Sequence, residues 1–552
     1  MTGDPESSAE SNSLADTIRR QLTPGRVTVA VAAAFVCYRL WLATQSGFGF
    51  HHGWNEGHYA LIARGYLTHP LVPQYGPGAP RYSVPPLFPY LVAVSFELFG
   101  QSTLAARFPS VLAGGGTIVA TYGLGRHLYD DRVGVASAIL LALLPMFGLY
   151  AGRAQTDVLL TFLFTVAIWL VVSGFDAEMA GTGYRRVLLA GIVLGAAFTA
   201  KQPAVLAVPV VAVWLLSQHR YDRDTLRRGV VYGAGTIIGL LPFAIWAYLN
   251  FRLAPEQFVG TWRHELFGRT APFANLPLIA AVGVGLGITP AVGVLAAGRA
   301  WMDSADTLRG LRTDAAEATR RLPSSVSVET VWLVVVGAFV LYRTPHGHQY
   351  YVVTLTPAVA ILAVRGFATA RTWAPRALGR PDSRRAITVI AAAVLLVSTL
   401  GGTAVLYEFS GEYSASEGSG STVVPETANG IAALQTEGST VYVPSGYQPQ
   451  FRWYLRGDVP IGSIKPYDPA SLTPARVQRM TNETDDTTYL VVPDPIWGPG
   501  GDLDERRVFR SDPYEPTLVT PLSPVIRTNS KLGYYVGDRR LAVYRLDRND
   551  SS

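Results

Sequence analysis

Apolar residues in this chain gather into separate runs of about 16 to 25 residues, the length needed to cross a hydrocarbon layer roughly 30 Å thick. Polar or arginine-rich stretches separate the runs. A membrane barrel would instead show alternating strands of about ten residues. The pattern therefore predicts a polytopic α-helical membrane protein.

The arginine-rich stretches predict how the chain threads through the membrane. Short loops rich in Lys and Arg stay on the cytoplasmic side. If every basic stretch lies there, the chain must cross and return between each pair of them. This arrangement predicts about 11 transmembrane helices, with a cytoplasmic N-terminus and an extracellular C-terminus. The basic stretches are the N-terminal tail, 125–132, 175–187, 218–228, 300–324 and 365–385.

The predicted spans alternate in direction. The outward spans are 27–45, 134–151, 187–200, 229–250, 327–343 and 386–407. The inward spans are 104–124, 157–174, 203–217, 272–298 and 349–364. One apolar run, "PPLFPYLVAVSFELFG", is short and rich in proline, and counting it as a span would reverse the side of every later basic loop.

That run, residues 85–100, is instead predicted to be an amphipathic helix on the outer surface of the membrane. Residues 46–103 then form a long first external loop with two surface helices, of which "NEGHYALIARGYL" is the first.

The composition changes after about residue 410, where a small-residue linker, "SGEYSASEGSGST", follows the last apolar run. Beyond the linker, the runs "STVYVPS", "TTYLVVPD" and "RLAVYRLD" alternate like strands. We therefore predict a cytoplasmic tail at 1–24, a transmembrane domain at 25–409 and an extracellular soluble α/β or α+β domain at 410–552.

The charge distribution excludes one class of partner. The net charge of +6 invites a nucleic-acid interpretation, but the arginines lie in short loops between apolar runs. No nucleic-acid partner is therefore predicted, and the bilayer is the expected surroundings. The single cysteine, Cys37, lies inside the first apolar run, so no internal disulfide can form.

Ionisable and aromatic residues recur at the predicted outer ends of the spans. Alone, each has a structural explanation: a cation can satisfy helix carbonyls, a tyrosine can belong to an interfacial belt, and an acid can favour a helix N-terminus. Lys201 is harder to explain, because it is the only lysine before residue 410. Its compact charge suits a partner such as a phosphate. The candidates are Asn55, Glu56, His58 and Tyr59 in the first loop, Arg153 and Asp157 in the second, Lys201 in the third, Arg263 in the fourth, and His348 and Tyr350 in the fifth.

Several motifs resemble those of the polyprenyl-phosphate-sugar-dependent C-type glycosyltransferases, the superfamily of the protein O-mannosyltransferases and the lipid A aminoarabinose transferases (glycosyltransferase family 39-like). "NEGHYALIARGYL" is similar to their Asp-Glu-x-x-Tyr-Ala loop, and "VPPLFPYLVAVSFELFG" to their Lys-Pro-Pro-Leu helix. "GRAQTDVLL", "GAAFTAKQPAVL" and "HQYYVVTLTPAVAILA" resemble the later turns in the same order. The resemblance covers about residues 25 to 370.

The resemblance implies the C-type glycosyltransferase fold and an inverting transfer of a sugar, with mannose the most frequent in the family. The donor would be a polyprenyl or dolichyl phosphate, and the acceptor a hydroxyl of a protein, lipid or glycan at the outer face. A carboxylate would act as general base, and cations would stabilise the lipid-phosphate leaving group.

The resemblance also suggests roles for individual residues. Glu56 is the first candidate for the base and Asp157 the second, because Asn55 stands where the family has an aspartate. Val84 replaces the lysine before Pro-Pro, and Arg81 is the candidate substitute for its charge. The predicted donor-phosphate group is Lys201, Arg81, Arg263, His348 and Tyr350. The predicted substrate-binding group is His58, Tyr59 and Arg153.

Two other functions stay open at this point: a transporter or flippase of lipid-linked saccharides, and a non-catalytic scaffold that binds glycans. No cofactor is predicted with certainty, and a divalent cation shared by carboxylates and the lipid phosphate is left open. Transporters place ionisable residues near the bilayer midplane. Here the spans are nearly free of charge, which favours the enzyme.

Overall fold

The computed structural model describes most of the helical part of the chain and the core of its C-terminal part. The described residues are 23–48, 53–75, 80–218, 222–267, 326–343, 349–377, 420–436, 438–455, 459–464, 487–494, 517–521 and 540–546, with isolated positions between 295 and 480.

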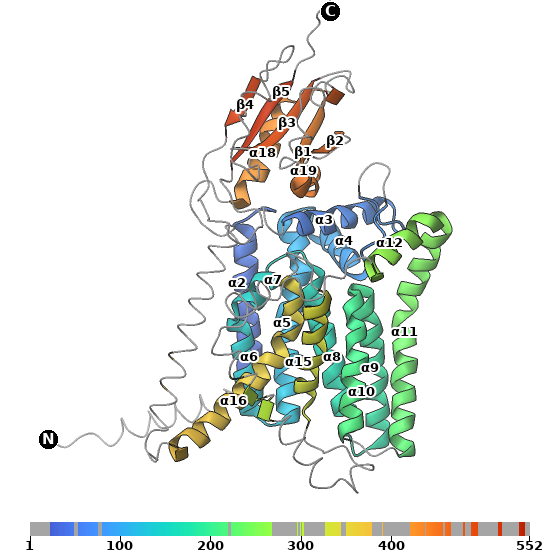
Figure 1. Ribbon diagram of the computed structural model, residues 1–552, viewed down its shortest axis with the longest axis vertical. Helices are drawn as coiled ribbons and strands as arrows, with labels where there is room; N and C mark the ends of the chain where they lie inside the picture. The colour runs from blue at the N-terminus through green and yellow to red at the C-terminus, as the bar shows by residue number, and fades with distance from the viewer. Residues whose placement is uncertain are drawn as a thin grey trace, which may run out of the picture.

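A bundle of apolar helices makes up most of the described chain (Figure 1). Five described helices are long and apolar enough to cross a membrane, or six if one bent pair counts as a single span. The prediction of a multi-pass helical membrane protein is confirmed. The bundle contains α2 (Pro24–Thr44), α5 (Thr103–Leu128), α6 (Asp131–Leu143), α7 (Pro145–Ala151), α8 (Thr156–Phe175), α9 (Ala180–Ala200), η1 (Gln202–Leu206), α10 (Ala207–Gln218), α11 (Arg223–Leu253), α15 (Val328–Arg343), η3 (Gln349–Leu355) and α16 (Thr356–Ala377).

The predicted spans fall on these helices, with two exceptions and one difference in shape. Spans 272–298 and 386–407 lie almost wholly outside the described residues. The predicted span 134–151 is not one straight helix, because α6 and α7 meet at a bend of 68°. Leu144 has an extended backbone there, as expected for a residue that precedes a proline, and Pro145 starts the new helix.

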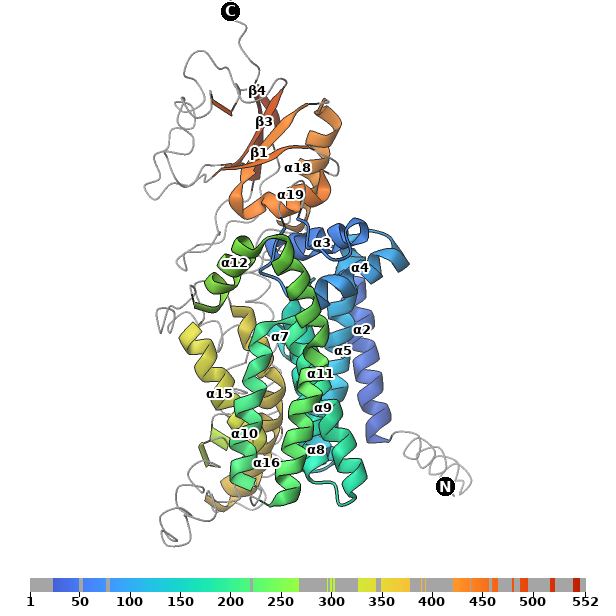
Figure 2. The same cartoon turned by 90° about the vertical axis from the view of Figure 1, so that its right-hand side faces the viewer.

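Three helices lie at one end of the bundle, next to the C-terminal domain: α3 (Gly53–Thr68), α4 (Leu87–Phe99) and α12 (Pro255–Phe267) (Figures 1 and 2). Helix α4 buries Phe88 and Val92, while Leu91 and Val94 on its other face are exposed. An apolar helix with one packed face and one exposed apolar face suits the surface of a bilayer. Its position agrees with the surface helix predicted at 85–100.

The C-terminal part contains a mixed five-stranded sheet with the order β2-β1-β3-β5-β4. Strand β1 pairs in parallel with β2 and β3, while β5 is antiparallel to β3 and β4. The strand-like runs of the sequence form β1, β3 and β5, but the short β2 and β4 were not predicted. The elements are α18 (Gly420–Leu434), β1 (Thr440–Pro444), α19 (Gln448–Tyr454), β2 (Ile461–Ile464), β3 (Thr488–Asp494), β4 (Thr517–Pro521) and β5 (Arg540–Leu546). Helix α18 begins inside the stretch that was predicted as linker.

Helix α19 docks the C-terminal domain onto α3 (Figure 2). The ring of Trp453 lies 4.1 Å from the guanidinium of Arg64, which also donates a hydrogen bond of 3.2 Å to the Trp453 carbonyl. The Tyr454 hydroxyl accepts a hydrogen bond of 2.7 Å from the backbone of Phe48. A Cβ atom at Gly57 would lie only 3.0 Å from the Pro449 backbone, so a glycine there allows the two helices to approach closely.

Helices α9 and α11 pack closely through two glycine pairs. "GIVLG" on α9 and "GTIIG" on α11 each place glycines four residues apart, and these face each other. A Cβ at Gly191 would lie 2.2 Å from the Tyr232 carbonyl oxygen, and one at Gly239 would lie 2.2 Å from that of Ile192. The helix backbones therefore touch where larger residues could not fit.

This contact predicts a position-specific effect of a single methyl group. We expect Gly239→Ala to destabilise the protein by about 1–3 kcal/mol, because the new Cβ meets backbone that cannot rotate away. Thermal unfolding of the detergent-purified protein measures the effect. Gly233→Ala on the same helix is the matched control, since a Cβ there meets nothing within 4 Å. Equal stability of the two variants would contradict the close packing.

Candidate functional site

A buried ion pair joins two of the predicted external loops. The Lys201 ammonium lies 2.6 Å from Oδ1 of Asp157, and the side chains are 9% and 2% exposed. Asp157 is in the first turn of α8. Lys201 follows the last residue of α9 with an extended backbone, and a 3-10 turn begins directly after it at Gln202-Pro203. The break between helices therefore leaves the lysine side chain at the end of the bundle rather than inside a span.

Aromatic rings surround the lysine. Its ammonium lies 4.6 Å from the ring centroid of Tyr350 and 4.5 Å from that of Tyr351. Tyr59 reaches the same place from α3: burial raises the pKa of its hydroxyl, and the charge of Lys201 opposes that shift. The faces of the two rings stabilise a cation from which water is removed. These five residues, Asp157, Lys201, Tyr59, Tyr350 and Tyr351, are called the Lys201 cluster below.

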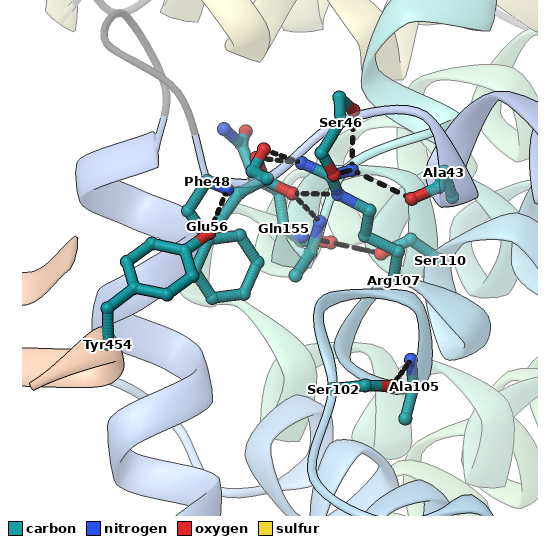
Figure 3. Close-up of polar contacts among 12 residues, drawn as sticks. Ala43, Ser46, Phe48, Glu56, Ser102, Ala105, Arg107, Ser110, Gln155 and Tyr454 are labelled. Carbon is teal, nitrogen blue, oxygen red and sulfur yellow. Dashed lines mark hydrogen bonds and ion pairs between the residues drawn. The ribbon is translucent and has the colours of Figure 1, made fainter. Parts of the chain in front are cut away.

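Glu56 lies in a second buried ion pair, with Arg107 of α5 (Figure 3). Its Oε1 accepts from Nε of Arg107 at 2.7 Å and its Oε2 from Nη2 at 3.0 Å. Oε1 also accepts from the backbone N–H of Ala154 at 2.9 Å. The guanidinium also donates to Ser46 and Gly47 at 2.7–2.8 Å and to the carbonyl of Ala43 at 3.4 Å. Both oxygens of the carboxylate are therefore occupied by protein donors.

Arg107 was not among the residues singled out from the sequence. It lies inside the predicted span 104–124, where a charged residue is rare and needs a partner. That signal is readable from the sequence, but the identity of the partner is not, because Glu56 is 51 residues away. The pair fastens α3 to the end of α2, to α5 and to the turn that leads into α8.

The other described candidates make different contacts from those of the Lys201 cluster. Arg153 is buried, with its guanidinium 6.0 Å from the Tyr150 ring centroid. Asn55 is half-buried on α3, and Arg263 is exposed on α12. The guanidinium of Arg81 lies 5.0 Å from the centroid of the Tyr75 ring. His348 is outside the described residues.

His58 is buried among aromatic rings on α3. It stacks on Trp54 with ring centroids 4.9 Å apart and lies 4.8 Å from the Tyr75 ring. Burial, assisted by the charge of Arg81, lowers the pKa of His58 to about 3. The imidazole is therefore neutral over the physiological pH range. Among the described residues, no group of three or more His, Cys, Asp or Glu side chains is placed to hold a metal ion.

Comparison with known proteins finds a matching family over part of the chain. Residues 83–248 match the dolichyl-phosphate-mannose-protein mannosyltransferase family. An undecaprenyl phosphate-α-4-amino-4-deoxy-L-arabinose arabinosyl transferase of Pseudomonas fluorescens is 29% identical over 203 residues, which is 35% of each chain. A protein of Aquifex aeolicus is 28% identical over 222 residues, covering 39% of this chain and 43% of its own length. The matched regions thus span less than half the length of these relatives.

Solved structures share the fold. ArnT from Cupriavidus metallidurans, bound to undecaprenyl phosphate, aligns over 93% of this chain and 97% of its own, with 18% identity and a TM-score of 0.59. The Archaeoglobus fulgidus oligosaccharyltransferase aligns over 84% of this chain and 69% of its own, with 12% identity and a TM-score of 0.50. This chain therefore shares the fold of these two structures. The resemblance and the fold class predicted from the motifs are thereby confirmed.

The C-type glycosyltransferase fold explains why distant motifs meet. The matched residues 83–248 include α8, α9 and most of α11. Asp157 lies on α8, and Lys201 directly follows α9. Tyr59 and Tyr350 lie outside the matched region on either side, and the fold brings them to the same ion pair. The cluster is therefore assembled from three separate parts of the chain.

The buried pair of Glu56 and Arg107 predicts a large loss of stability in a single variant. We expect Glu56→Ala to cost about 3–5 kcal/mol, because Arg107 is left buried without its counter-charge. Thermal unfolding followed by tryptophan fluorescence is the measurement. The double variant Glu56→Leu with Arg107→Met should recover part of the loss. A single variant as stable as the parent protein would show that the pair is not structural.

The neutral state of His58 predicts a dependence of stability on pH. The folded-state pKa is about 3, below the ordinary value of 6.5, so the unfolded chain binds the proton more readily. The contribution of His58 is fully present above pH 6.5 and is lost as the pH falls toward 3. We expect the melting temperature of the parent protein to fall more steeply between pH 7.5 and 5 than that of His58→Gln. Parallel pH profiles for the two proteins would contradict a buried neutral imidazole.

Proposed function

We propose that this protein transfers a sugar from a polyprenyl- or dolichyl-phosphate donor to an acceptor hydroxyl at the outer face of the membrane, with inversion at the anomeric carbon. The observation that carries the proposal is the buried pair of Asp157 and Lys201 at 2.6 Å. It provides a carboxylate and a cation at the end of the bundle, on the side of α3 and the C-terminal domain. The named relatives that act on undecaprenyl phosphate sugars support the donor class.

Lys201 is proposed to stabilise the negative charge of the departing lipid phosphate. An ammonium that is already buried and held by fixed groups stabilises developing charge without reorganisation in the transition state. The rings of Tyr350 and Tyr351 hold it in place, at 4.6 and 4.5 Å. The adjoining apolar helices provide the surroundings for an isoprenoid tail.

Asp157 is proposed to be the general base, ahead of Glu56. Both oxygens of Glu56 are engaged, by Arg107 and the Ala154 backbone. Taking up a proton there would break a buried ion pair, which costs several kcal/mol. Asp157 differs because the hydrogen bond from the ammonium of Lys201 goes to Oδ1 alone. Glu56 is then a positioning residue, because its hydrogen bond with the Ala154 backbone fixes the turn that precedes Asp157.

The ion pair also suggests how the base becomes available. In the free protein, the ammonium of Lys201 holds Oδ1 of Asp157 at 2.6 Å. A lipid phosphate that binds beside Lys201 competes for the same ammonium. Asp157 is then released to take the proton of the acceptor hydroxyl as that oxygen attacks the anomeric carbon and the lipid phosphate departs.

The sugar and the acceptor are proposed only as classes. Mannose appears in the name of the matched family, and aminoarabinose in the names of the relatives, so these two sugars are the first to test. We further propose that α3, α4, α12 and the C-terminal domain face the extracellular side, which would place the donor and the acceptor in the same compartment. The bundle-end position of Lys201 favours this enzyme over a transporter, whose ionisable sites lie near the midplane.

Sugar transfer can be tested directly with purified protein and radiolabelled polyprenyl-phosphate mannose or aminoarabinose. We expect release or transfer of the sugar by the parent protein and a loss of at least about 100-fold in Asp157→Asn, the size typical for removal of a general base. Lys201→Met should also lose activity. Lys201→Arg should keep only part of the parent activity, because a planar guanidinium replaces a compact ammonium.

Asp176→Asn is the matched control, because Asp176 directly follows the last residue of α8, at the opposite end of that helix, and its side chain is 46% exposed. It should keep the activity of the parent protein. Full activity of Asp157→Asn would overturn the assignment of the base. Movement of the lipid across the bilayer without sugar release would instead support a flippase.

A further inference from the structure

Two arginines from different domains act electrostatically on the same residue, Tyr75, at the seam between the predicted first external loop and α19. The backbone N–H of Arg81 donates to the carbonyl of Pro73 at 2.8 Å, and Gln74 forms a bridge with Pro80. Its guanidinium lies 5.0 Å from the centroid of the Tyr75 ring. Arg452, on α19 of the C-terminal domain, provides the second charge that acts on this tyrosine.

The two cations are not balanced by an acid among the described residues. Burial lowers the pKa of Arg452; Tyr75 opposes this effect, and the charge of Arg81 adds to it. The described ion pairs join other residues and include neither Arg81 nor Arg452. Arg452 donates one hydrogen bond, of 3.2 Å, to the carbonyl of Ile461, which leaves donors of its guanidinium for another group.

A third polar group lies under the same surface. His58 is only 5% exposed, and its Nδ1 has no hydrogen-bond partner in the described part of the chain. Its ring contacts Tyr75 and stacks on Trp54, which is 40% exposed. A buried nitrogen without a partner is costly and points to a ligand or a water that satisfies it.

We propose that Arg81 and Arg452, with His58 beneath them, bind an anionic group of the acceptor, a phosphate or a carboxylate. The inference rests on the proposed function, since it assigns the acceptor to this seam and the donor phosphate to the Lys201 cluster. Guanidinium groups bind both anions through paired hydrogen bonds. The anion would relieve the repulsion between the two arginines.

The seam suits the acceptor rather than the donor for a structural reason. Arg452 belongs to the C-terminal domain, which lies beyond the bundle end, while Lys201 lies where α9 ends (Figure 2). Arg81 is exposed, and Tyr75 and His58 lie between it and the protein interior. An acceptor held there contacts both domains at once. The C-terminal domain then takes part in selecting acceptors that carry a negative charge.

The binding of inorganic phosphate tests the site in the full-length protein, at constant ionic strength with chloride as the reference anion. Trp54 provides the signal, because its exposed ring stacks on His58. We expect a saturable change in tryptophan fluorescence that is absent in Trp54→Phe. Arg81→Gln and Arg452→Gln should each weaken the apparent affinity by about tenfold or more, the size of one lost charge-assisted hydrogen bond.

Controls separate the site from general charge effects and from the donor. Arg227→Gln, an exposed arginine at the far end of α11, should bind phosphate like the parent protein. Protein saturated with undecaprenyl phosphate should give the same phosphate response, since the lipid would occupy the Lys201 cluster. Sugar release from the donor is measured separately, so a failure of the proposed function leaves the phosphate result readable.

Three results would overturn the proposal. These are a phosphate response no larger than that of chloride, equal responses in the parent protein and Arg452→Gln, or loss of the response when undecaprenyl phosphate is bound. The last would assign the arginines to the donor instead. A response that survives lipid loading and is lost in both arginine variants would support the acceptor site.

Discussion

The buried ion pair between Glu56 and Arg107 is the contact on which the membrane-surface end of the protein depends. Taking two charges out of water costs several kcal/mol for each ion, and only good geometry with further hydrogen bonds offsets that cost. Arg107 meets this condition by donating to both oxygens of Glu56 and to Ser46 and Gly47. Its rigid fork thus fixes the loop after α2, the surface helix α3 and the core helix α5 in one arrangement.

That arrangement determines where the chemistry can take place. Glu56 also accepts from the backbone of Ala154, so the turn between α7 and α8 is held against α3. The bend at Pro145 directs α7 toward this turn, and Asp157 follows in the first turn of α8. A second helix break, after Ala200, brings Lys201 to the same depth. Irregular backbone is tolerated where protein surrounds it, and here the turn before α8 and the break after α9 lie beside Asp157 and Lys201.

The sequence predicted the helical class and the segments that meet, but not which side chains form pairs. The length of an apolar run and the positions of arginines depend on each segment by itself. They therefore predicted single spans well, and 157–174 and 327–343 coincide with helices α8 and α15. Pairing depends on rotation and tilt of helices, which the hydropathy pattern does not contain. Glu56 therefore looked like a free acid in a loop, and its partner Arg107 lay hidden in a span. The predicted spans 272–298 and 386–407 lie almost wholly outside the described residues, and His348 lies outside them.

The two cationic places differ in how their charge is balanced, and this difference is the basis for assigning them separate ligands. Lys201 has a carboxylate at 2.6 Å and two ring faces, so its charge is compensated before any ligand arrives. An ammonium that already has a counter-charge suits negative charge that develops only during the reaction, because it exchanges one anion for another. Arg81 and Arg452 meet at the domain seam without a described acid. Uncompensated cations suit an anion that stays bound throughout the reaction, which is what holding an acceptor requires.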